Sequence, residues 1–356
     1  WPVSKKAVVT GHRGLVGYSC VKALLIHGYE VHGIDNNIRG QLFDDAPSFI
    51  KHGRLVDNDS LFEYDFDLRS KQQVDEFFKN LAINGIDLVV HCAAQPSHDW
   101  ATNNPHTDFE LNTTATLNIC EAIRNFSSET LLIFLSTNKV YGDTPNRLPL
   151  TEGTIRYEIE TSHKFYQGID ESMSIDQTLH SLFGVSKTAA DLYVQEYSRY
   201  FNIPAIILRG GCLTGAHHRG ARQHGFMNYL IRCALNKTLY TIEGYNGKQV
   251  RDNLHSDDIG DLVVLAAQSH ETKHIDYPVV SNLGGGRKNS VSILELISIL
   301  SKSYGLDIPY EISAKNRKGD HVWYISDTGK LRNLFNWTPR RTLNDIIEET
   351  IKFVSI

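Results

Sequence analysis

Three glycines near the start of the chain, Gly11, Gly14 and Gly17, have the spacing of a phosphate-binding turn. The first suits a tight turn from a strand into a helix, the second lets the backbone approach a pyrophosphate, and the third lets the helix pack closely on a sheet. Free N–H groups and the positive end of the helix dipole would attract the phosphates. The pattern predicts a dinucleotide site, with Leu15 and Val16 in the first turn of the helix.

An acidic residue stands where such a site would meet a ribose. Asp35 follows Gly11 by 24 residues, at the end of the second expected strand. Its carboxylate would accept hydrogen bonds from the ribose hydroxyls and repel a 2′-phosphate, which favours NAD over NADP. Arg39 is close by in sequence and could instead meet a phosphate. To the same site, mostly at the ends of expected strands, we assign Asn36, Asn37, Asp67, Leu68, Ala93, Ala94, Gln95 and Asn112.

Short apolar segments alternate with longer amphipathic ones over the part of the chain that carries these residues. The expected strands are 7–10, 30–35, 61–67, 86–91, 131–135, 204–208 and 279–283, and the expected helices are 15–27, 71–81, 109–125 and 183–201. This alternation predicts βαβ units with right-handed crossovers and therefore helices on both faces of a parallel sheet. We predict an α/β fold: a Rossmann-type doubly wound parallel sheet with a smaller mixed α/β lobe.

Two regions break the alternation. Residues 210–258 and 289–356 mix short helices and strands, so we assign them to a substrate-binding lobe and assign 1–209 plus 259–288 to the NAD-binding domain. Residues 144–178 are long, polar and irregular, which is typical of a loop over an active site.

Composition excludes several classes of protein. With 36 basic and 41 acidic residues the net charge is −5, which argues against a partner held by nucleic-acid phosphates. No apolar run approaches the roughly 20 residues that span a bilayer. The five cysteines are scattered and unpaired in sequence, which favours a reducing, cytoplasmic location over a disulfide framework. His217, His218 and His224 lack partners at ligand-like spacing, so no metal is predicted.

A second group of residues follows the fifth expected strand. Thr137 lies in the run S-T-N-K-V-Y-G-D, and Lys187 follows fifty residues later in F-G-V-S-K on an expected helix. Together with T-G-x-x-G-x-x-G, these runs resemble the extended short-chain dehydrogenase/reductase family. Within it they resemble the CDP-hexose 2-epimerases of the CDP-paratose/CDP-tyvelose type. The runs G-I-D-E-S and G-K-Q-V-R-D extend the likeness over nearly the whole chain.

The resemblance implies NAD-dependent epimerisation of a nucleotide-diphosphate sugar. A hydroxyl would lose its proton to a base while a hydride passes to the nicotinamide and later returns to the other face. In the family a tyrosine is the base, a lysine matching Lys187 holds the nicotinamide ribose and lowers the pKa of the tyrosine, and a residue matching Thr137 orients the hydroxyl. The resemblance also implies a homodimer or homotetramer, built through helices 109–125 and 183–201.

The chain departs from this pattern at Phe183, which stands where the family has its tyrosine. Three explanations are open: a substitution introduced into the protein, a natural replacement with another base, or a protein that binds a nucleotide sugar without turning it over. The second explanation, a natural replacement, includes a related oxidoreductase or isomerase that uses a different base. We favour a natural replacement. The candidate bases are Tyr166, His180, Lys139 and Lys187, and His180 shares the face of Phe183 if the helix has begun by then.

The resemblance also predicts a substrate site. Arg251 would contact the pyrophosphate, because a guanidinium matches its oxygens in pairs. Asn138 and Lys139 replace the acidic pair of the related 4,6-dehydratases, which argues against dehydration. Phe226 could cover the base or pack in the core, and Arg317 could bind phosphate or stay solvated. The full predicted set is Ser97, His98, Asn138, Lys139, Gly225, Phe226, Arg251, Arg317 and Asp320.

Overall fold

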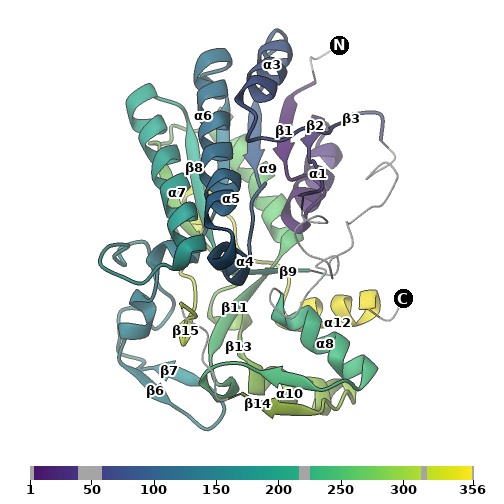
Figure 1. Cartoon of the computed structure of the whole chain (residues 1–356), viewed down its shortest axis with the longest axis vertical. Helices are drawn as coiled ribbons and strands as arrows, with labels where there is room; N and C mark the ends of the chain where they lie inside the picture. The colour runs from purple at the N-terminus through teal and green to yellow at the C-terminus, as the bar shows by residue number, and fades with distance from the viewer. Residues whose placement is uncertain (1–3, 39–57, 216–224, 314–318, 355–356) are drawn as a thin grey trace.

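A seven-stranded parallel sheet is the centre of the computed structural model, which describes residues 4–38, 58–215, 225–313 and 319–354 (Figure 1). Its strands run in the order β12-β8-β5-β4-β1-β2-β3, and every neighbouring pair is parallel. The order reverses between β1 and β4, where ligands of such sheets bind beyond the carboxyl ends of the strands. The strands are β1 (Lys6–Thr10), β2 (Glu30–Ile34), β3 (Leu61–Tyr64), β4 (Leu88–His91), β5 (Leu131–Thr137), β8 (Ala205–Gly210) and β12 (Val279–Leu283).

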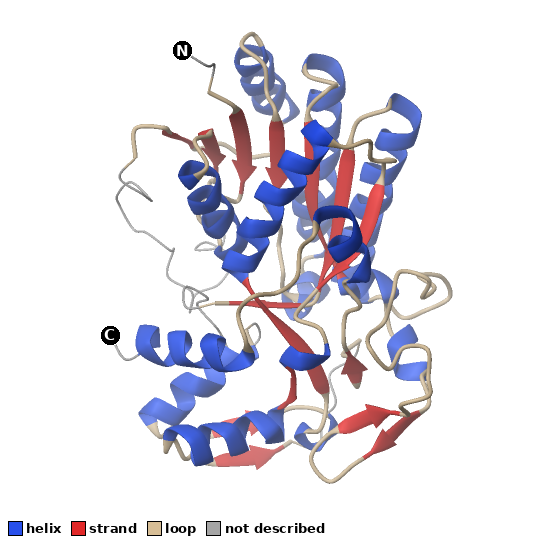
Figure 2. Ribbon diagram, turned by 180° about the vertical axis from the view of Figure 1, so that it is seen from behind, coloured by secondary structure: helices blue, strands red, loops and turns tan. Residues whose placement is uncertain are grey.

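Helices cover both faces of this sheet (Figure 2). One face packs against α1 (Leu15–Ile26), α9 (Ser256–Thr272) and α11 (Gly329–Phe335), and the other against α3 (Lys71–Ala82), α6 (Ala115–Phe126) and α7 (Ser181–Phe201). Strands covered on both sides are apolar at successive positions rather than at alternate ones. The predicted doubly wound Rossmann-type fold is confirmed.

Smaller sheets lie beyond the carboxyl ends of the main strands (Figure 1). One contains β9 (Cys212–Thr214), β11 (Val250–His255), β13 (Ser290–Ser292) and β15 (Trp323–Tyr324), and the other pairs β10 (Tyr240–Ile242) with β14 (Tyr310–Ile312). The helices α8 (Phe226–Asn236), α10 (Ile293–Tyr304) and α12 (Leu343–Val354) share an apolar core of their own. These elements come from the two segments that the sequence assigns to a substrate lobe.

Most of residues 144–178 are irregular as predicted, but the prediction that they form a loop over the active site is wrong. This segment contains the hairpin of β6 (Leu150–Glu152) and β7 (Tyr157–Ile159). Its residues Phe165 and Ile169 are buried in one cluster with Trp323. These apolar contacts attach the segment to the smaller lobe, and none of its residues lines the cavity described below.

Two short helices, α4 (His98–Asn103) and α5 (Pro105–Phe109), follow β4, and a π-helical turn over Glu110–Thr114 joins them to α6. The helix expected at 109–125 therefore starts earlier and contains an irregular turn. The helix expected at 183–201 begins at Ser181, with His180 as its N-cap residue. Among the described residues, none of the helices combines the length and apolar character that crossing a bilayer requires.

Candidate active site

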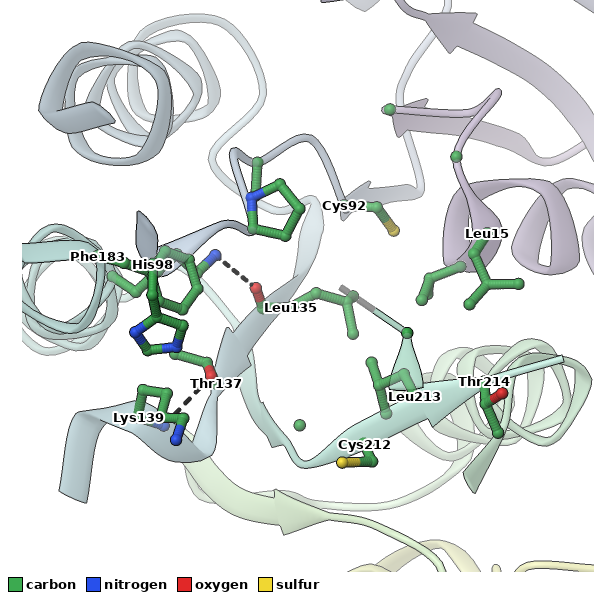
Figure 3. A pocket seen from close by; sticks show the side chains of 18 of the residues that line it. Leu15, Cys92, His98, Leu135, Thr137, Lys139, Phe183, Cys212, Leu213 and Thr214 are labelled. Atoms are coloured by element: carbon green, nitrogen blue, oxygen red, sulfur yellow. Dashed lines mark hydrogen bonds between the residues drawn. The ribbon is translucent and has the colours of Figure 1, made fainter. Parts of the chain in front are cut away.

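A cavity of about 530 Å³ brings together parts of the main sheet and of the smaller lobe (Figure 3). From the main sheet it is lined by the glycine turn, by the residues that follow β4 and β5, and by the first turns of α7. From the smaller lobe it is lined by residues of β9, α8, β10 and β11. The cavity thus lies at the carboxyl edge of the sheet, beside the switch point.

Glycine is required at two positions of the turn between β1 and α1. Gly11 has φ +65°, and a Cβ atom there would lie 2.8 Å from the backbone nitrogen of Ala93. A Cβ atom on Gly17 would lie 2.1 Å from the carbonyl oxygen of Gly11. Gly14 is the N-cap residue of α1, and no side chain caps that helix end. The first N–H groups of α1 are therefore directed at the cavity, as a pyrophosphate requires.

The carboxylate of Asp35 is fixed where β2 ends. One of its oxygens accepts from the backbone N–H of Arg13 at 3.1 Å and the other from that of Asn37 at 2.8 Å. The guanidinium of Arg13 is directed at Glu63 instead, with an N–O distance of 3.1 Å. An acceptor at the end of β2 beside a glycine turn fits the ribose and pyrophosphate of NAD.

Most of the residues predicted for the cofactor meet in this cavity. Its lining includes Gly11, Gly14, Leu15, Val16, Gly17, Asp35, Asn36, Asn37, Asp67, Leu68, Ala93, Ala94 and Lys187. Gln95 and Asn112 are buried away from the lining. The Asn112 side chain accepts from the Gln95 N–H at 2.9 Å and donates to the Ser186 hydroxyl at 3.0 Å, so the pair joins the segment after β4 to α7. Arg39 lies outside the described residues.

Thr137 and Phe183 lie on one side of the cavity (Figure 3), and Lys187 also lines it. The buried ammonium of Lys187 donates to the Leu135 carbonyl at 2.8 Å and lies 4.5 Å from the centre of the Phe134 ring. Burial lowers the pKa of Lys187 to about 8. Phe183 is one turn before Lys187 on α7 and is buried. The side chain at this position therefore brings no ionisable group to the site.

Only two of the four candidate bases reach the cavity. Lys139 and Lys187 line it, whereas His180 and Tyr166 do not. The Nε2 of His180 donates to the Val140 carbonyl at 2.9 Å, and Arg287 stacks on the Tyr166 ring at 3.8 Å. The structure therefore gives His180 the role of a hydrogen-bond donor to the backbone.

Opposite charges meet where the smaller lobe lines the cavity. Arg251 donates to an Asp320 carboxylate oxygen at 2.6 Å, and the Lys139 ammonium lies 3.6 Å from the same oxygen. Burial alone would raise the pKa of Asp320, but the two cations lower it well below its usual value. Burial also lowers the pKa of Lys139 to about 8. The cluster suits a ligand that carries both phosphates and hydroxyl groups.

The remaining residues that the sequence predicts for the substrate divide into three groups. His98, Asn138, Gly225 and Phe226 line the cavity together with Lys139, Arg251 and Asp320. Ser97 does not, because it is buried and its hydroxyl accepts from the Trp100 N–H at 3.2 Å as the cap of α4. Arg317 lies outside the described residues.

Sequence reasoning missed lining residues from the smaller lobe, among them Gln249 and Asn253. Gln249, Arg251 and Asn253 occupy every second position of β11 and the residue that precedes it, and all three line the cavity. Alternate residues of a strand share a face, so this period was a usable signal. Cys92 and Cys212, which the sequence did not single out, are partly exposed in the lining.

Comparisons with known proteins agree with this geometry. The model of the NAD dependent epimerase/dehydratase family matches residues 7–282. The chain is 30% identical to CDP-paratose 2-epimerase of Salmonella typhi, over 98% of this chain and 99% of that protein. It is 27% identical to UDP-glucose 4-epimerase of Corynebacterium glutamicum, over 98% and 96%.

Among solved structures, a UDP-glucose-4-epimerase from Stenotrophomonas maltophila with bound NAD and formylated UDP-arabinopyranose superimposes with a TM-score of 0.78. The two chains are 20% identical, over 99% of this chain and 98% of that one. The doubly wound sheet, glycine turn and acidic residue after β2 define a dinucleotide-binding protein. The chain belongs to the NAD dependent epimerase/dehydratase family, and NAD is its cofactor.

Proposed function

We propose that this protein is an NAD-dependent nucleotide-sugar epimerase that inverts C2 of a CDP-hexose of the CDP-paratose/CDP-tyvelose type. The observation that carries the proposal is the likeness to a CDP-paratose 2-epimerase, at 30% identity over 98% of the chain, which includes both the glycine turn and the charged cluster. The UDP-glucose 4-epimerase is a less similar relative, at 27% identity.

The chain's residues have separate tasks in this reaction. Bound NAD supplies a hydride acceptor that later returns the hydride. The glycine turn and Asp35 hold its pyrophosphate and ribose, and Lys187 donates to the nicotinamide ribose from beside the Leu135 carbonyl. The Thr137 hydroxyl orients the sugar hydroxyl, and Arg251 contacts the diphosphate. Arg251 would then share its charge between Asp320 and phosphate.

Phe183 supports a second candidate, a related enzyme or a binding protein that does not epimerise. The test incubates the NAD-loaded protein in deuterated water with CDP-paratose, CDP-tyvelose or UDP-glucose. We expect CDP-paratose and CDP-tyvelose to interconvert without deuterium at C2, because the hydride returns from the cofactor. We also expect no net change in the absorbance of reduced nicotinamide.

Other outcomes would contradict the proposal in different ways. Deuterium at C2 would indicate proton abstraction from carbon instead of hydride transfer. Accumulation of reduced nicotinamide would indicate an oxidoreductase. Interconversion of UDP-glucose alone would move the reaction to another carbon and nucleotide. Binding of the nucleotide sugars without any product would indicate a binding protein.

The same proposal includes an assembly and a location. Exposed apolar side chains along α7, among them Val185 and Tyr193, support a homodimer or homotetramer that packs through this helix. The five free cysteines support a cytoplasmic location, where thiols stay reduced.

A further inference from the structure

We propose that His98 is the catalytic acid–base residue, which takes the sugar hydroxyl's proton in place of the missing phenol. The inference rests on the proposed epimerase function and adds the group that the family pattern lacks here. His98 is the first residue of α4 and lines the cavity with Phe183, Thr137 and Lys139. His98 is not among the four candidate bases predicted from the sequence.

The imidazole lies beside the position that the phenol would occupy. Its ring meets the Phe183 ring edge-on, with 4.7 Å between the ring centres. In Figure 3 the His98 ring lies between Phe183 on one side and Thr137 and Lys139 on the other. A sugar hydroxyl oriented by Thr137 would therefore lie near the imidazole.

Ser181 fixes the orientation of this ring. Its hydroxyl oxygen lies 2.9 Å from Nδ1 of His98 and also accepts from the backbone N–H of Gly184 at 3.2 Å. We assign the tautomer in which Nδ1–H donates to Ser181, which makes Nε2 the nitrogen that accepts the proton. Ser181 has φ +66°, a backbone conformation that is unfavourable for serine. Strain of this kind concentrates at functional sites, and here it directs the hydroxyl to His98.

The two lysines in the cavity are less suited to accept a proton. Lys139 donates to the Gly319 carbonyl at 3.0 Å and is paired with Asp320, which favours its charged form. Lys187 donates to the Leu135 carbonyl. An imidazole is ordinarily neutral above about pH 6.5 and can both take and return a proton near neutrality.

Atoms and electrons are conserved in the proposed step. The C2–H bond breaks and its electron pair leaves with the hydride to the nicotinamide, while the O–H bond breaks and its proton passes to Nε2 of His98. The products are a ketone and an imidazolium. When the hydride returns to the opposite face of the carbonyl carbon, the imidazolium protonates the alkoxide oxygen. No outside oxidant, reductant or proton donor is consumed.

The test compares His98→Asn with wild-type protein and with His106→Asn, which removes an exposed histidine on the neighbouring α5. We expect His98→Asn to lower kcat for CDP-paratose by about a hundredfold or more, the usual contribution of general acid–base catalysis. Its NAD content and its Kd for CDP should stay within about twofold of wild type, and reduced nicotinamide should not form in a single turnover. His106→Asn should behave as wild type.

A second pair of variants separates proton transfer from a structural role. Phe183→Tyr in the His98→Asn background restores the phenol of the family pattern and should raise kcat at least about tenfold, since a positioned acid–base group contributes that much or more. Ser181→Ala leaves His98 in place but releases its ring. It should lower kcat without changing KM and should shift the acid limb of the kcat–pH profile.

The outcomes distinguish this inference from the proposed function. An active wild type with an equally active His98→Asn variant would overturn the role of His98 and leave the epimerase proposal intact. Two other results with an active wild type would also overturn the role of His98. One is a His98→Asn variant that loses only its affinity for CDP, and the other is an unchanged kcat–pH profile in Ser181→Ala. A wild type that converts none of the sugars would overturn the proposed function, and the role of His98 with it.

Discussion

The ammonium group of Lys187 is buried between the sheet and α7, where a positive charge is unfavourable because it has lost its water. Burial lowers its pKa from 10.5 to about 8, so between these pH values the unfolded chain binds more protons than the folded one. The free energy of unfolding should therefore rise with pH in this window, by about 3 kcal/mol from this group. Lys187→Met removes that rise, which urea unfolding of NAD-free protein near pH 7 and near pH 10 can measure.

A matched variant isolates the effect of burial. Lys79 is an exposed lysine near the end of α3, so Lys79→Met should keep the wild-type dependence of stability on pH. If Lys187→Met and the wild type changed in parallel between the two pH values, the ammonium of Lys187 would not be desolvated in the folded protein.

Local sequence patterns located the glycines and Asp35. A turn that needs positive φ requires glycine, and a strand end that meets a ribose requires an acidic residue, so both are recognisable within one βα unit. His180 was misplaced because its proposed role assumed an ordinary helix before Phe183. The backbone instead turns at Ser181, with φ +66°, and directs His180 to the Val140 carbonyl. A left-handed serine leaves no composition signal, and so neither this turn nor the Ser181–His98 contact could be predicted.

At the scale of elements, the glycines in the turn between β1 and α1 serve two different purposes, close packing and ligand binding. A Cβ atom on Gly14 would lie 3.2 Å from the Gly11 carbonyl oxygen, close but tolerable, whereas one on Gly17 would overlap the backbone. Gly14→Ala should therefore cost at most about 1 kcal/mol of stability. Its methyl group would stand where the pyrophosphate approaches, so the Kd for NAD should rise at least about tenfold.

Calorimetric titration with NAD and urea unfolding measure the two effects separately. Gly17→Ala is the comparison, because overpacking at the helix–strand contact should cost about 1–3 kcal/mol of stability before any ligand is added. Unchanged NAD affinity in a folded Gly14→Ala variant would show that α1 does not hold the pyrophosphate.

The main sheet was predictable because all of its strands except β3 are buried on both faces, so most of them are apolar runs between amphipathic helices. The smaller lobe was not, since its strands are only two to six residues long and pair with distant segments. The hairpin at β6 and β7 shows the consequence. The backbone N–H of Tyr157 donates to the Lys248 carbonyl at 2.9 Å, a contact with no local signature in a polar segment.

For the whole molecule, the proposed function would divide the ligand between the two lobes. The main sheet carries the glycine turn and Asp35, whereas Arg251 and Asp320 come from the other lobe. The sugar hydroxyl would lie where the two meet, beside Thr137 and His98. The sheet follows from a local pattern of strands and helices, whereas the site depends on residues that lie far apart in the sequence.

The outer face of α7 is apolar although it is exposed. Leu182, Val185, Leu192 and Tyr193 are each between 41% and 51% exposed, and their spacing places them in one stripe along the helix. A two-fold axis beside this helix would bury the stripe against its own copy. We therefore expect Val185→Glu with Tyr193→Glu to convert the proposed homodimer or homotetramer into a smaller species in light scattering, because each glutamate would bury a charge at the contact. The matched control is Tyr310→Glu with Ile312→Glu on β14, whose side chains are 45% and 49% exposed but lie far from α7. The control should keep the wild-type mass. A monomeric wild type, or an equal loss of mass in both double variants, would contradict assembly through α7.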